Sequence, residues 1–183
     1  MNTSKNQRVI IVGAAPGRES DPNRPLVPTQ SGRGTAASLL QTMQLDPCSF
    51  EVIFERHYII SVHAGRSRNG DRFPKAMALA GVAKLTPLLR GRTVVLIGKK
   101  TASAFGIGHL APCTWSQETL GTPSGNKMPS IMPSIMPTTI AWVPSPCGLN
   151  LWWNSQENRQ AGEAFLLALA HQGFQATVRG VAA

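Results

Sequence analysis

Four short runs of apolar, mostly β-branched residues most constrain what this chain can fold into. They cover residues 9–12, 58–62, 93–97 and 139–143, and each leads into a loop. Continuous apolar runs of this length are typical of strands buried on both faces of a parallel sheet. Helix-like stretches lie at 34–43, 74–89, 100–105 and 156–172, the last capped by Ser155. The alternation predicts an α/β fold, a three-layer α/β/α domain with a central, mainly parallel four-stranded sheet.

The chain length favours one domain. With 183 residues and 42% hydrophobic composition, we expect a single domain over residues 1–183. Residues 121–137 contain a tandem Met-Pro-Ser-Ile, and repeated proline excludes helix and ladder pairing. We expect an irregular surface excursion there. It is either an insertion without function or one wall of a cleft.

The charge balance favours a polyanionic partner. Lys and Arg number 18 against nine Asp and Glu, a net charge of +9 that is typical of nucleic-acid binding. A basic but unspecialised surface is the alternative. Cys48, Cys113 and Cys147 are odd in number and lack CxxC pairing, which predicts free thiols in a reducing compartment. No signal-peptide core or membrane span is evident, so we expect a cytoplasmic protein without a membrane partner.

The loops after the four runs are the expected binding region, because ligands of open parallel sheets lie outside the carboxyl ends of the strands. The loop after residue 12 has no lysine and lacks Walker-loop glycine spacing. The "GKKT" after the third run has no glycine five residues before it, and no G-x-G-x-x-G follows any run. Nucleoside triphosphates and NAD are therefore poor candidates.

Four sequence blocks, in order along the predicted strands, carry a resemblance. They are "GAAPGRESDPNRPLVPTQSG", "YIISVHAGRSRN", "VVLIGKKTASAFG" and "VPSPCGLN". Together they resemble the uracil-DNA glycosylase superfamily, the first block its iron–sulfur branch and the last its mismatch-specific branch. The resemblance implies a DNA glycosylase, a monomer without a cofactor. It would flip a base out of DNA and hydrolyse its N-glycosidic bond, leaving an abasic site.

The resemblance also implies site residues. The base pocket would be formed by Gly13, Ala14, Ala15, Pro16, Gly17, Ser61 and Asn150. DNA would be held by Ser31, Arg33, Arg66, Arg68, Lys99, Lys100, Ser145, Leu149, Leu151 and Trp152. Two alternatives stand beside these roles. Trp152 and Trp153 could bury against the last helix, and the cationic clusters could form a solvated face.

Departures from the family pattern bear on the substrate. Ala14 and Ala15 replace polar residues, Ser61 or His63 stands where the family has a base-reading asparagine, and Val143 replaces a histidine. Gly65 falls where a cluster cysteine would stand, so neither an iron–sulfur cluster nor another metal is expected. Gly17 replaces the tyrosine that blocks C5 substituents. These changes predict a larger or C5-substituted pyrimidine, removed in base excision or in defence against modified phage DNA.

The candidate catalytic residues are Glu19, Asp21 and His63, with Asp71 in reserve. A carboxylate can orient water and oppose positive charge on the sugar, and a histidine can protonate or hydrogen-bond the leaving base. The plainer interpretations are a turn capped by Asp21 and a core or rim histidine. Two other functions stay open: a catalytically silent DNA-binding reader of the same fold, and a base-modifying transferase.

Overall fold

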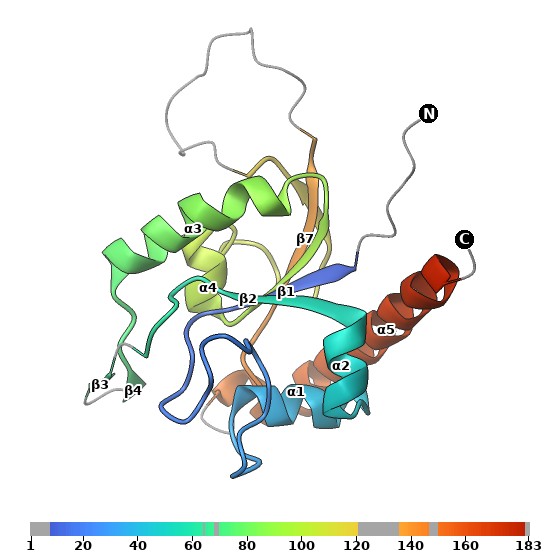
Figure 1. Cartoon of the computed structure of the whole chain (residues 1–183), viewed down its shortest axis with the longest axis horizontal. Helices are drawn as coiled ribbons and strands as arrows, with labels where there is room; N and C mark the ends of the chain where they lie inside the picture. Colours follow the sequence, from blue (N-terminus) through green and yellow to red (C-terminus); the bar gives the residue numbers. More distant parts are fainter. Residues whose placement is uncertain (1–7, 64, 68–69, 121–135, 147–149, 182–183) are drawn as a thin grey trace, which may run out of the picture.

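The computed structural model describes residues 8–63, 65–67, 70–120, 136–146 and 150–181, and its centre is a sheet of strand order β2-β1-β5-β7-β6 (Figure 1). Four strands run parallel: β1 (Val9–Gly13), β2 (Phe54–Tyr58), β5 (Thr93–Ile97) and β7 (Thr138–Val143). β6 (Ser116–Glu118) pairs antiparallel with β7. A separate hairpin joins β3 (Arg66–Ser67) to β4 (Gly70–Asp71). The mainly parallel α/β sheet is confirmed, but it has five strands instead of the predicted four.

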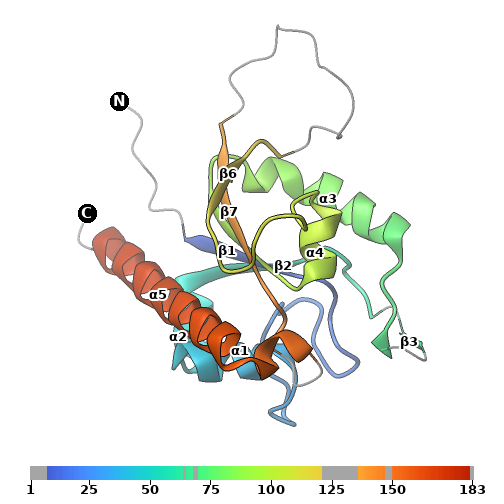
Figure 2. The same ribbon diagram turned by 180° about the vertical axis from the view of Figure 1, so that it is seen from behind.

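Helices cover both faces of this sheet (Figures 1 and 2). One face carries α1 (Thr35–Met43), α2 (Pro47–Ile53) and α5 (Gln156–Val181). The other carries α3 (Lys75–Leu89) and α4 (Lys99–Ala104). A short 3-10 helix, η1 (Leu151–Asn154), leads into α5. Alternate side chains of one strand serve the two faces: Ile11 lies in the core under α1 and α5, and Ile10 in the core under α3.

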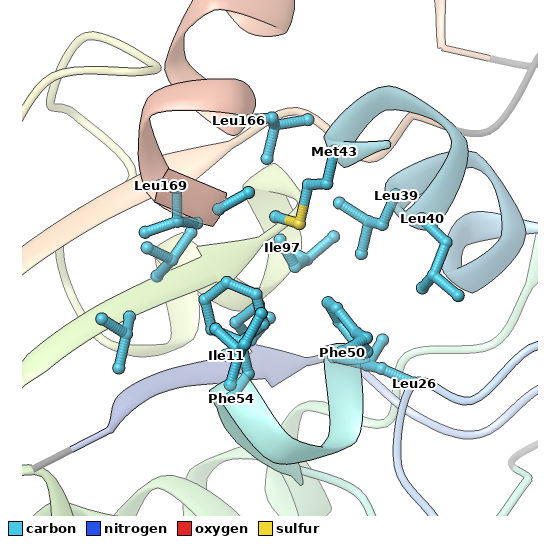
Figure 3. Packing of buried hydrophobic residues seen from close by; sticks show 14 of the residues in the cluster. Ile11, Leu26, Leu39, Leu40, Met43, Phe50, Phe54, Ile97, Leu166 and Leu169 are labelled. Atoms are coloured by element: carbon cyan, nitrogen blue, oxygen red, sulfur yellow. The ribbon is translucent and has the colours of Figure 1, made fainter. Parts of the chain in front are cut away.

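The core on the α1, α2 and α5 face is assembled from both ends of the chain (Figure 3). Phe50 of α2 and Phe54 of β2 pack with their ring centroids 5.2 Å apart. Met43 of α1 and Leu166 of α5 lie in the same cluster, and both are buried. The last helix therefore fastens α1 to the sheet, and α1 begins at the edge where the loops meet.

The second strand lies earlier in the chain than predicted. The apolar run at 58–62 predicts a strand, but β2 is Phe54–Tyr58, which contains Glu55, Arg56 and His57. β2 is an outer strand of the sheet, so its charged side chains reach partners. Glu55 pairs with Arg92 at 2.8 Å and with His57 at 2.9 Å.

Ile59 and Ile60 follow β1 beyond the end of β2. Their N–H groups donate to the carbonyls of Gly13 and Ala14, each at 3.0 Å. Helix α3 packs directly on this segment, because a Cβ at Gly81 would lie 1.7 Å from the Ile59 carbonyl oxygen. Ile59 and Ile60 are therefore a buried connection under α3, whereas Ser61 and Val62, at the end of the predicted run, are exposed.

Besides the β3–β4 hairpin and η1, the elements β6 and α2 were not predicted. β6 is three polar residues, too short and too polar to show a strand pattern. α2 does carry start signals: Asp46 accepts a hydrogen bond from the N–H of Ser49 at 3.0 Å, and Pro47 occupies the first turn. The other helices begin within a residue of their predicted starts, and α5 extends beyond 172 to Val181. Residues 121–135 of the predicted excursion lie outside the described residues.

Candidate functional site

The strand order places a topological switch point at the carboxyl ends of β1 and β5. The chain leaves β1 for α1 on one face and leaves β5 for α4 on the other, although β1 and β5 are neighbours. In open α/β sheets, ligands bind outside the carboxyl ends of the strands at such a switch point. The loops after β1, β2, β5 and β7 are therefore the candidate site.

The described contacts bring these four loops together. The hydroxyls of Thr35, which begins α1, and Ser145, which follows β7, lie 2.9 Å apart. Gly98, at the end of β5, donates its N–H to the Val143 carbonyl at 2.7 Å. The imidazole Nδ1 of His63, after β2, lies 3.3 Å from the carbonyl oxygen of Pro16 in the loop after β1. Residues far apart in sequence thus surround one end of the sheet.

The loop between β1 and α1, residues 14–34, is held by its own turns. The N–H groups of Ser20, Arg24, Val27 and Gly32 each donate to a carbonyl three residues earlier, at 2.9–3.4 Å. Leu26, at φ 57° and 3% exposed, packs inward from this loop. Its N–H donates to the Tyr58 hydroxyl at 2.9 Å. The loop is a compact, anchored structure.

The predicted pocket floor lies where this loop leaves β1. Gly13 and Pro16 are buried, Ala14 and Ala15 are half-buried, and Gly17 is exposed. A Cβ at Gly13 would lie 3.0 Å from the Tyr58 ring, so glycine lets β2 end close against β1. Ala15 packs on the core under α3. Its methyl group therefore contributes to that core.

His63 is half-buried, and the geometry assigns its tautomer. A carbonyl oxygen only accepts hydrogen bonds, so the contact with Pro16 requires a proton on Nδ1. In the neutral ring, Nε2 is then unprotonated and can accept a proton. Ser61, two residues earlier, is exposed.

The two predicted catalytic carboxylates lie in a different part of the loop. Glu19 and Asp21 are exposed and line an open hollow of about 470 Å³. Asp21 Oδ1 accepts the Asn23 N–H at 2.8 Å, which makes it the turn-forming residue of the plainer interpretation. Arg24, also in the lining, pairs with Glu51 of α2 at 2.9 Å. Neither Pro16 nor His63 lines this hollow.

The loop after β7 is braced by its own side chains. Asn150 donates from Nδ2 to the Ser145 carbonyl at 3.1 Å and accepts the Trp152 N–H at 3.1 Å. The Trp153 indole N–H donates to the carbonyls of Pro144 and Ser145. The Asn150 amide is thus held by two hydrogen bonds within its own segment.

Trp152 and Trp153 pack against α5. A Cβ at Gly162 would lie 2.4 Å from the Trp153 ring and 3.1 Å from the Trp152 ring. The two rings meet edge to face, with their centroids 5.0 Å apart. The structure thus favours the alternative that the two tryptophans pack on the last helix, where both are half-buried. Leu151 points outward with 79% of its surface exposed, and Leu149 lies outside the described residues.

The predicted DNA contacts are partly described. Lys99 and Lys100 begin α4 beside Gly98 and are exposed, as are Ser31 and Arg33. The Ser31 hydroxyl lies 2.8 Å from that of Thr29. Arg66 and the reserve carboxylate Asp71 belong to the β3–β4 hairpin, where only their backbone is described. Arg68 lies outside the described residues. Cations thus occur in the loops after β1 and β5.

Tyr58 and Thr35 were not predicted as site residues. Tyr58 is the chain's single tyrosine and ends β2, and Thr35 follows the glycine-rich "SGRG". Burial raises the pKa of the Tyr58 phenol above its usual value, and its contacts with Leu26 and Ser20 oppose the shift. Tyr58 is the first residue of the second apolar run. Its partner Leu26 lies 32 residues earlier, so no local sequence pattern indicates the contact.

Within the described part of the chain, no group of three or more His, Cys, Asp or Glu side chains is placed to hold a metal ion. In the same part, no helix is both long and apolar enough to cross a membrane. Cys48 is an exposed free thiol and Cys113 a half-buried one, and Cys147 lies outside the described residues.

Fold and site together define a mainly parallel α/β protein whose loops converge at the switch point of its sheet. No protein-family model matches the chain, and no curated protein matches it either.

Proposed function

We propose that this protein is a DNA glycosylase that hydrolyses the N-glycosidic bond of a flipped, modified pyrimidine. The resemblance of four sequence blocks to the uracil-DNA glycosylase superfamily is one support. The observation that carries the proposal is the contact of His63 with Pro16, because it sets an imidazole against the expected base pocket. The net charge of +9 supports a nucleic-acid partner.

The assigned tautomer gives His63 a definite role in this reaction. Its Nε2 takes a proton from water as the water oxygen bonds to C1′ of the sugar, and the bond from C1′ to the base nitrogen breaks. The base leaves with the bonding electron pair. It then receives the proton from the imidazolium, which restores the neutral ring. General acid–base catalysis of this kind contributes about 10²–10⁴-fold.

Lys99 and Lys100 are the proposed phosphate contacts, and Leu151 is the proposed wedge into the base stack. The lysines lie at the end of β5 beside the switch point. Leu151 is 79% exposed and begins η1, in which the Trp153 indole N–H donates to the Ser145 carbonyl. A wedge held in this way offsets part of the cost of unstacking the flipped base. Ser145 and Arg33 complete the proposed DNA contacts.

The decisive experiment incubates duplexes containing uracil, hydroxymethyl or glycosylated pyrimidines with the protein, then detects abasic sites by alkaline cleavage and free base by mass. We expect cleavage by the wild type, and a loss of about 10²-fold or more in His63→Ala. His109→Ala is the matched control, because His109 also contacts a backbone carbonyl through Nδ1, at 3.1 Å, but in the loop after α4.

The other functions give different results in the same assay. Salt-sensitive binding with no base released from any duplex would make the protein a reader and overturn the proposal. A base that stays attached but changes mass would indicate a transferase. Equal activity of His63→Ala and wild type would remove His63 from the mechanism.

A further inference from the structure

The hollow in the loop between β1 and α1, here called the loop hollow, has no role in the mechanism above. It is lined by Glu19, Ser20, Asp21, Arg24, Val27, Pro28, Thr29 and Gln30. Its volume of about 470 Å³ lies within the roughly 300–1,000 Å³ typical of small-ligand sites. The turns that fix this loop also fix the lining, so the hollow exists before a ligand arrives.

The lining defines what can enter. Six of the eight lining side chains carry polar groups and two, Val27 and Pro28, are apolar, so the hollow offers a ligand both hydrogen-bonding groups and apolar surface. The carboxylates of Glu19 and Asp21 repel phosphate. Arg24 offsets this only in part, because its guanidinium is paired with Glu51 at 2.9 Å.

Hydroxyl groups match the remaining chemistry. Carboxylates accept hydrogen bonds from hydroxyls, and the side chains of Ser20, Thr29 and Gln30 can donate as well as accept. Val27 and Pro28 provide a small apolar surface for C–H groups. A sugar presents both hydroxyls and C–H groups, and carries no charge that Arg24 or the carboxylates would oppose.

One backbone turn ties the lining of the loop hollow to the end of the expected pocket floor. Ser20, in its lining, donates its N–H to the Gly17 carbonyl at 3.2 Å, and Gly17 is the last residue of the predicted pocket floor. We infer that the loop hollow binds a neutral, hydroxyl-rich group, which is a sugar attached at C5 of the target pyrimidine. This inference rests on the proposed function and names its substrate class.

The test compares two duplexes that differ only in the substituent, one with a hydroxymethyl pyrimidine and one with its glucosylated form. We expect a higher kcat/KM on the glucosylated base. Gln30→Ala should lower kcat/KM on that base about tenfold, the worth of one or two hydrogen bonds, and leave the hydroxymethyl base unchanged. Gln41→Ala, an exposed glutamine on α1, is the matched control.

A second arm separates a base-linked sugar from a free one. Methyl glucoside is titrated into the protein without DNA and followed by saturation-transfer NMR, for wild type and Gln30→Ala. Binding lost in the variant supports a hydroxyl-binding hollow even where no duplex is cleaved, so the two proposals can fail separately. Equal kcat/KM on both duplexes, together with no glucoside signal, overturns the inference and leaves the glycosylase proposal in place.

Discussion

The backbone N–H of Leu26 donates a hydrogen bond to the hydroxyl of Tyr58 at 2.9 Å, and this contact joins the loop after β1 to the end of β2. Leu26 is 3% exposed, so its N–H has little access to water. The Tyr58 ring also lies against Gly13, where β1 ends. One side chain thus fixes the start and the middle of the loop that forms both the expected pocket and the loop hollow.

Tyr58→Phe should weaken this anchor. The substitution keeps the ring but leaves the buried Leu26 N–H without its acceptor, which costs about 1–3 kcal/mol in the free energy of unfolding. Urea unfolding measures the loss, and amide exchange should show faster exchange at Leu26. An unchanged midpoint and unchanged Leu26 exchange would contradict the anchoring role.

The ionisation of Tyr58 predicts the alkaline limit of stability. Burial raises the pKa of the folded phenol above 10, so the unfolded chain loses its proton first as pH rises. The contribution of Tyr58 to the free energy of unfolding is therefore full below pH 10 and falls as the pH approaches the folded pKa. Absorbance at 295 nm reports this phenol alone, since the chain has one tyrosine. In Tyr58→Phe, the free energy of unfolding should lack the part of the alkaline decline that this phenol causes. The same slope of the free energy of unfolding against pH in both proteins would exclude Tyr58 as its cause.

Gly81→Ala should destabilise the fold. Helix propensity alone would make the change favourable by about 1 kcal/mol. The new Cβ, however, would lie 1.7 Å from the Ile59 carbonyl oxygen, which forces α3 away from the sheet. Overpacking of this kind costs about 1–3 kcal/mol. Thermal unfolding gives the sign directly, and a raised Tm would show that α3 does not pack this closely.

Replacing Lys99 and Lys100 by alanine should weaken DNA binding uniformly across sequences. Each phosphate contact contributes about 0.9 to the slope of log K against log salt, so the double variant should lose nearly two units of slope. Titration of labelled duplex at several salt concentrations measures this. Arg90→Ala is the control. Arg90 is exposed and lies between α3 and β5, at the amino end of β5 and therefore at the opposite end of that strand from the lysines. Equal slopes for wild type and the lysine variant would place the DNA elsewhere.

Local sequence patterns were sufficient for most of the secondary structure. β1, β5 and β7 are continuous apolar runs, and such runs are stable only where both faces are covered. β2 could not be found in this way. An outer strand tolerates Glu55, Arg56 and His57 because their charges find partners: Arg56 pairs with Glu51 of the preceding helix, and Glu55 pairs with Arg92, a distant residue that only the fold brings near.

The sequence by itself determined the α/β class, the strong positive charge and the importance of the loops that follow the strands. The tertiary structure alone decided which side chains meet. It set His63 against Pro16 and Thr35 against Ser145, and it placed Glu19 and Asp21 in a hollow that neither Pro16 nor His63 lines. The physical reason is range: apolar periodicity is a local property of the chain, whereas a hydrogen bond between residues 47 or 110 positions apart depends on how the strands are ordered in the sheet.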